Sequence, residues 1–322
     1  MSGAEPRVGL VLGAGGVTGG AFHAGVLAAL EQATGWDPRE AAIAVGTSAG
    51  SITATALRAG LCAADMLARA ESRSMSAQGQ QLMGGVGPLA ASPLRPAVRV
   101  HRPAGIAALL ARAAARPFSA APWTLLAGLI PDGSVSTDAI SEGIGGLFPD
   151  NWPLAPLWIC AVGQADGRRV VFGRDPLRPP VAAAVAASCA IPGFFRPVTI
   201  DGKAYVDGGV HSPTNADLLT GEGLDLVLVS SPMSLSGRHL QRGVSQAVRL
   251  WSRALLDAEV LRLRRRGVPV VAFQPTPDDA AVMGANAMDP GPRAAVARQA
   301  RESTLRRIAR SDSRDRLALL FD

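Results

Sequence analysis

The chain has 322 residues, of which 48% are hydrophobic and 18% charged, and its formal net charge is +6. That length and apolar content suffice for one large core or two modest ones, and no apolar run is long enough for a transmembrane helix. The positive charge comes almost entirely from arginine, but no nucleic-acid-binding module, aromatic stacking platform or long basic run accompanies it, so we expect no nucleic-acid partner.

The first part of the chain alternates strands and helices. Residues 8–12 predict a buried strand, and residues 20–32 predict a helix with apolar side chains on one face. A second buried strand is predicted at 41–45, and a helix follows at 51–58. This rhythm is typical of a parallel sheet with helices on its faces.

Regularity is lost between about residues 74 and 136, a segment rich in Gly, Pro, Ala and Arg with apolar patches at 106–110 and 123–126. Long irregular segments of this kind are often functional and sometimes merely connect ordered elements. Two interpretations stay open: a lid or lipid-facing cap over a site, or a poorly packed connection.

Regular elements return in the second half of the chain. The predicted strands lie at 157–162, 169–172, 197–200, 204–206, 226–229 and 268–273. The predicted helices lie at 181–188, 244–265 and 293–310. We therefore expect one α/β domain over residues 1–322, with its chemistry-bearing motifs within about 8–216 and a helical C-terminal extension over about 236–322.

A serine stands between two glycines where the second predicted strand meets its helix. Gly46, Ser48 and Gly50 form a G-x-S-x-G motif, and such a turn points the serine hydroxyl out of the sheet. The glycines permit unusual backbone angles and leave room for substrate, while the following helix directs its positive end at the serine. The motif predicts a nucleophilic serine.

The first predicted strand ends in a glycine-rich run, residues 13–20. A dinucleotide site would require G-x-G-x-x-G, but the sixth position counted from Gly13 is Thr18, and no other frame completes the pattern. Successive amides on such a turn can instead form an oxyanion hole. Because neighbouring parallel strands present their loops at one edge of a sheet, we expect this run beside Ser48.

A serine nucleophile needs a base, and the four histidines are weak candidates. His23 lies in the first predicted helix, where a packed structural role is favoured. His101 and His239 have no supporting motif, and His211 comes too soon after the Asp-Gly-Gly sequence for a conventional triad.

Asp207 is the better candidate, because Gly208 and Gly209 let the chain turn sharply and bring the carboxylate to the sheet edge. An ordinary aspartate has a pKa of about 3.9 and is a weak base, but desolvation would raise that pKa. Asp201 and Gly202 repeat the dipeptide, but they read as a hairpin turn that needs no catalytic explanation.

Together these motifs resemble the patatin-like phospholipases, which are hydrolases with a Ser–Asp dyad. The matching segments, in the family order, are 15–19, 46–50, 187–192 and 207–209. The resemblance implies a three-layer α/β fold with a mainly parallel sheet and helices on both faces. It also implies Ser48 as nucleophile, Asp207 as base and oxyanion amides from Gly15, Gly16 and Val17.

The chain departs from the family pattern at two places. Thr18 stands where the family usually carries Arg or Lys, and one extra residue separates that position from His23. The leading hypothesis is a serine esterase acting on acyl lipids without metal or cofactor. The alternative is a non-catalytic lipid-binding or regulatory protein on the same fold.

Location and partners follow from the ends, the cysteines and the charge. Residues 1–7 lead directly into an apolar strand, so we expect no signal peptide. Cys62, Cys160 and Cys189 are odd in number and widely spaced, which fits a reducing compartment and argues against a disulfide framework or zinc site. We expect a cytoplasmic protein whose arginine-rich surface makes transient contact with anionic membranes.

Overall fold

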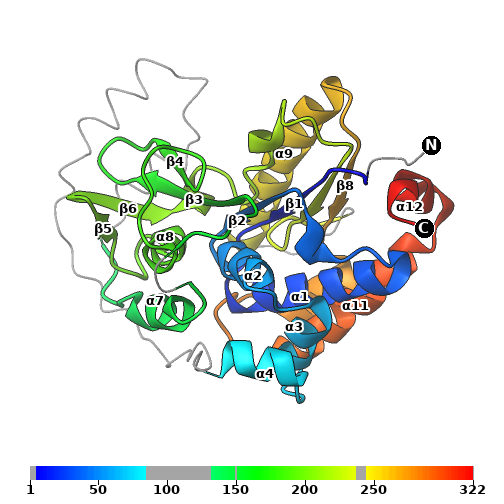
Figure 1. The fold of residues 1–322 in the computed structure, drawn as a ribbon, viewed down its shortest axis with the longest axis horizontal. Helices are drawn as coiled ribbons and strands as arrows, with labels where there is room; N and C mark the ends of the chain where they lie inside the picture. Colours follow the sequence, from blue (N-terminus) through cyan, green and yellow to red (C-terminus); the bar gives the residue numbers. More distant parts are fainter. Residues whose placement is uncertain (1–4, 85–131, 149–150, 237–243, 322) are drawn as a thin grey trace.

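The computed structural model describes residues 5–84, 132–148, 151–236 and 244–321 (Figure 1). The strands are β1 (Val8–Leu12), β2 (Ile43–Thr47), β3 (Leu157–Gly163), β4 (Arg169–Phe172), β5 (Val198–Ile200), β6 (Lys203–Asp207), β7 (Leu226–Ser230) and β8 (Val270–Phe273). The α-helices are α1 (Gly16–Thr34), α2 (Ala49–Arg58), α3 (Ala63–Ala70), α4 (Ala77–Met83), α7 (Asp138–Gly145), α8 (Val181–Ser188), α9 (Val244–Arg265), α10 (Pro277–Met283), α11 (Arg293–Ile308) and α12 (Ser311–Arg316).

Within these residues, eight strands form one sheet in the order β5-β6-β3-β2-β1-β7-β8, with β4 also paired to β3. Strands β3, β2, β1, β7 and β8 are joined by parallel pairings, while β4 and the β5–β6 hairpin are added by antiparallel pairings. The sheet is therefore mainly parallel, as predicted, and β1 and β2 are neighbours whose carboxyl ends lie at the same edge.

Helices cover both faces of this sheet (Figure 1). Leu10 and Leu12 of β1 belong to one core cluster with residues of α1, α2, α8 and α11. Val11, which points the other way because side chains alternate along a strand, belongs to a second cluster with Leu256 and Leu263 of α9. The predicted three-layer arrangement is confirmed.

Helix α1 begins earlier than predicted. It starts at Gly16, so much of the glycine run expected to be a loop forms the first turn of the helix. The Gly19 amide donates to the Gly15 carbonyl at 2.9 Å, and a Cβ added to Gly15 would approach the Pro232 side chain to 2.8 Å. Tight packing against that proline explains the glycine at position 15, directly before the helix.

The C-terminal helices pack onto the first helix. At Gly25 of α1, an added Cβ would collide with the Ala297 carbonyl oxygen of α11. Ala297 and Ala300 are fully buried at this crossing. The predicted extension thus covers one side of the core, and β7 and β8 widen the sheet itself.

Most of the predicted irregular segment, with both of its apolar patches, lies outside the described residues. Its described ends form α4 and a short bridge between Val135 and Phe195. No helix in the described ranges is both long enough and apolar enough to span a bilayer.

Candidate active site

Ser48 sits on a strained turn between β2 and α2. Its φ is 53° and its ψ is −124°, a combination that is rare for a residue with a side chain. The turn is held by hydrogen bonds: the Ser48 amide donates to Ser188 Oγ at 2.9 Å, and Ser188 Oγ donates to the Cys160 carbonyl at 2.7 Å. At the other side, the Ser48 carbonyl accepts from Ser51 Oγ at 2.6 Å. This geometry matches the nucleophile elbow that the motif predicts.

The two motif glycines are explained by close backbone approach. A Cβ on Gly46 would lie 2.5 Å from Ser51 Cα, and a Cβ on Gly50 would collide with the Leu12 carbonyl at the end of β1. The first turn of α2 therefore packs directly against the ends of both strands, and this contact holds Ser48 at the sheet edge.

Asp207 ends β6 and lies beside β3, paired with Ala161. Its carboxylate accepts a hydrogen bond from the Gly209 amide at 2.7 Å, and a Cβ on Gly208 would collide with the Cys160 carbonyl. Burial raises the pKa of Asp207 to about 6, although the nearby Ser48 hydroxyl and the Gly209 amide oppose the rise. The carboxylate thus lies near Ser48, in a site that makes it more basic than an exposed aspartate.

Three amides at the start of α1 complete the site. The Ala14 amide donates to the Pro213 carbonyl at 2.8 Å and the Thr18 amide donates to the Ala287 carbonyl at 3.1 Å. Between them, the amides of Gly15, Gly16 and Val17 have no acceptor among the residues that the structure describes. They stand at the positive end of a 19-residue helix, where an anion is stabilised.

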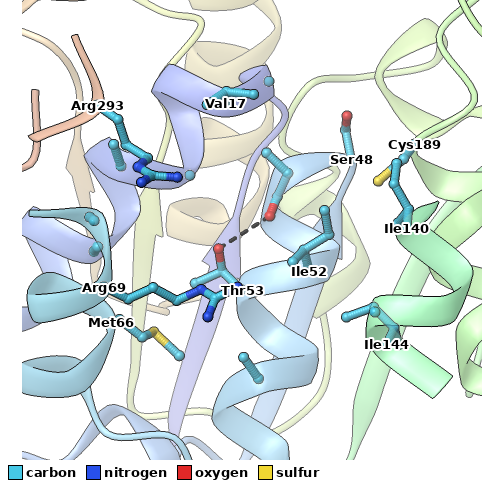
Figure 2. A pocket seen from close by; sticks show the side chains of 18 of the residues that line it. Val17, Ser48, Ile52, Thr53, Met66, Arg69, Ile140, Ile144, Cys189 and Arg293 are labelled. Carbon is cyan, nitrogen blue, oxygen red and sulfur yellow. Dashed lines mark hydrogen bonds between the residues drawn. The ribbon is translucent and has the colours of Figure 1, made fainter. Parts of the chain in front are cut away.

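Ser48 lies where two apolar cavities meet. The first, of about 210 Å³, extends between α2, α3 and α7 and is called the α3–α7 cavity (Figure 2). The second, of about 300 Å³, extends towards α9 and is called the α9 cavity. Both are lined by Gly16, Ser48, Ile191 and Met288.

The two cavities differ in chemistry. Asp207 and Gly209 line the α9 cavity together with Trp251. The α3–α7 cavity is walled by aliphatic and thioether side chains and by two arginines, Arg69 and Arg293. Apolar cavities with a few convergent polar groups are typical of ligand-binding sites.

The comparison with family models decides the family. The model described as Patatin-like phospholipase matches residues 10–220. The chain belongs to the patatin-like phospholipase family. Membership supports lipid acyl hydrolysis at the level of the family.

Individual relatives of this patatin-like chain are more distant. It is 33% identical over 94 residues to uncharacterized NTE family proteins of Mycobacterium bovis and Mycobacterium tuberculosis, a match over 29% of this chain and about a quarter of the relatives' length. VipD from Legionella pneumophila is 16% identical at a TM-score of 0.40, over 95% of this chain and 67% of that one. The type III effector protein ExoU is 19% identical at a TM-score of 0.35, over 98% and 54%.

The two described histidines of this patatin-like chain, His23 and His211, line neither cavity at Ser48. His23 is fully buried; its Nε2 donates to the Gly13 carbonyl at 2.8 Å and its Nδ1 lies 2.8 Å from Ser230 Oγ. Desolvation lowers its pKa to about 4, so it is neutral and ties the ends of β1 and β7 together. The structural role expected for His23 fits these contacts.

His211 faces a different set of charges. Burial, together with the charges of Arg169 and Arg262 and against that of Asp217, lowers its pKa to about 4. Neither cavity at Ser48 is lined by His211. His101 and His239 lie outside the described residues.

The structure also describes the Asp201–Gly202 turn and Thr18, the residue that departs from the family pattern. Asp201 and Gly202 form the exposed turn of the β5–β6 hairpin, both with positive φ, as predicted for a simple turn. The Thr18 side chain, at the position where a basic residue was expected, is buried.

Several residues of the site are not predicted by the sequence motifs. Ser188, which supports the Ser48 amide, was noted only as part of a family motif. Arg69, Arg293 and Trp251 were not singled out, because they come from three helices that are brought together only by the tertiary fold. In the described part of the chain, no three His, Cys, Asp or Glu side chains are grouped as metal ligands would be.

Proposed function

We propose that this patatin-like chain is a serine esterase that cleaves acyl lipids through a Ser48–Asp207 dyad and an acyl-enzyme intermediate. The observation that carries the proposal is the buried Asp207 carboxylate, whose pKa is influenced by the nearby hydroxyl of a serine on a strained turn. That serine lies next to unpartnered helix amides, and strained backbones of this kind cluster at catalytic sites.

In the proposed reaction, Asp207 takes the hydroxyl proton as Ser48 Oγ attacks the ester carbonyl carbon. The carbonyl oxygen becomes an oxyanion, which accepts hydrogen bonds from the amides of Gly15, Gly16 and Val17. The tetrahedral intermediate then collapses, its bond to the alcohol oxygen breaks, and Asp207 returns the proton to that oxygen.

Deacylation repeats these steps with water. Asp207 takes a proton from the water as its oxygen attacks the acyl carbon, and the released Ser48 oxygen receives that proton. A pKa of about 6 suits this role, because the carboxylate is mostly ionised near pH 7 and yet is a stronger base than an ordinary aspartate.

The direct test is hydrolysis of short-chain p-nitrophenyl esters by the wild type, Ser48→Ala and Asp207→Asn. We expect both variants to lose at least about 10³-fold in kcat/KM, as is usual for the loss of a catalytic group. His211→Ala is the matched control and should keep most of the activity. A fluorophosphonate probe should label Ser48, as mapped on the digested peptide.

The same assay separates the alternative function. A lipid-binding protein without turnover would hydrolyse the ester equally slowly as wild type and as Ser48→Ala, and it would take no label at Ser48. Label on another residue, or loss of activity in His211→Ala but not in Asp207→Asn, would overturn the dyad.

A further inference from the structure

Two arginine side chains reach into a cavity that is otherwise apolar. Arg69 comes from α3 and Arg293 from the start of α11, and both line the α3–α7 cavity. Figure 2 shows both guanidinium groups on the side of the cavity opposite Ile140 and Ile144 of α7.

Arg293 has few partners for a guanidinium so placed. Its Nη2 donates a long hydrogen bond of 3.4 Å to Ser72 Oγ, while its Nε is buried without a hydrogen-bond partner among the described residues. Within the same residues it forms no ion pair. Burying a donor of a charged group without an acceptor costs free energy, so the arrangement is suited to an acceptor supplied by a ligand.

The charge of Arg69 adds to that of Arg293. The pKa of Arg69 is lowered by desolvation and by the positive charge of Arg293, which places the two guanidinium groups within electrostatic range of each other. An anion between them would relieve this repulsion. Arg293 is also the first residue of a 16-residue helix, whose positive end favours negative charge.

We infer that Arg69 and Arg293 form an anion subsite in the α3–α7 cavity, which selects lipid esters that carry a carboxylate or phosphate on the arm bound there. The guanidinium fork matches the planar oxygens of either group. This inference rests on the proposed function for the place of the ester at Ser48, and it adds the chemical class of the substrate.

The test compares anionic and neutral esters matched in every other respect. One pair carries the charge on the alcohol arm: 1-oleoylglycerol 3-phosphate against 1-oleoylglycerol. The other pair carries it on the acyl arm: the p-nitrophenyl monoester of decanedioic acid against p-nitrophenyl decanoate. In at least one pair we expect the wild type to prefer the anionic ester by about tenfold or more in kcat/KM, and the pair that shows it identifies the anion.

The variants are Arg293→Gln, Arg69→Gln and Arg293→Lys. Each glutamine variant should lower the anionic-to-neutral ratio about tenfold, and lysine, which keeps the charge but loses the fork, should lower it less. Arg298→Gln removes an exposed charge from the same helix and should leave the ratio unchanged. Two independent glutamine variants keep the test valid if one of them fails to fold.

A binding experiment separates this inference from the proposed function. In the Ser48→Ala background, 1-oleoylglycerol 3-phosphate or decanedioate monoester should raise the melting temperature more than its neutral counterpart, and adding Arg293→Gln should remove the difference. If the wild type hydrolyses no ester, the proposed function fails and this measurement alone decides the anion subsite. Equal ratios in the wild type and both glutamine variants, with equal thermal shifts, would overturn the subsite.

Discussion

Asp207 determines the pH dependence of the proposed reaction. Burial raises its pKa to about 6, and only the ionised carboxylate can accept the Ser48 proton. We therefore expect kcat/KM for a neutral ester to rise about tenfold per pH unit below 6 and to level off above it. The measurement is a pH–rate profile on p-nitrophenyl butyrate, with rates corrected for spontaneous hydrolysis. A profile that is flat from pH 4 to 6 would exclude Asp207 as the base.

The titratable side chains of His23 and Cys189 do not change protonation state in the upper part of this pH range. Burial lowers the pKa of His23 to about 4, so this residue is mostly neutral above pH 5; its ring nitrogens lie against the Gly13 carbonyl and Ser230 Oγ. Burial also raises the pKa of the Cys189 thiol, which packs near Ser51, so it remains protonated. Between pH 5 and 6 the ascending limb should accordingly report mainly Asp207.

At the scale of elements, the crossing of α1 and α11 depends on one glycine. A Cβ on Gly25 would collide with the Ala297 carbonyl, whereas a Cβ on Gly20 of the same helix would meet nothing within 4 Å. We expect Gly25→Ala to destabilise the protein by about 2 kcal/mol or more, since α11 must move away. Gly20→Ala should stabilise it by about 0.5–1 kcal/mol through helix propensity. Urea unfolding of both variants checks this, and equal effects would contradict the close crossing.

The elements also differ in whether the sequence alone predicts them. The turns at Ser48 and Asp207 could be located because Gly46, Gly50 and Gly208, which close backbone approach requires, stand beside those residues in short motifs. The start of α1 could not, because Gly15, which precedes the helix, packs against Pro232, which is distant in sequence. Propensity alone predicts a loop there.

The residues that line the cavities could not be predicted from the sequence for the same reason, because long-range packing brings them together. Arg69 and Arg293 belong to unremarkable helical segments, and their approach depends on α11 lying against α1 and α3. The sequence therefore revealed the proposed reacting groups at the sheet edge but not the residues that we propose select the substrate.

At the scale of the whole molecule, the proposed catalytic pair reduces the free energy of unfolding. Asp207 ionises with a pKa near 3.8 when the chain is unfolded and about 6 when it is folded. Below about pH 4, Asp207 is protonated in both the folded and the unfolded protein and does not affect stability. As pH rises from about 4 to 6, ionisation of Asp207 stabilises the unfolded state relative to the folded state. Above pH 6 the full cost to folding, about 2–3 kcal/mol, is present. We expect Asp207→Asn to raise the free energy of unfolding by about that amount at pH 8 and by little at pH 4. Denaturant titrations at both pH values test this, and an equal gain at both would contradict it.

The strained backbone of Ser48 also lowers the free energy of unfolding. Holding a residue with a side chain at its positive φ costs about 1–3 kcal/mol, and glycine would relieve that cost. A library of random variants selected only for survival after heating would therefore accumulate glycine at position 48 and asparagine at position 207. Heat selection on this chain would enrich inactive proteins, so any search for a more robust variant must score turnover in the same round.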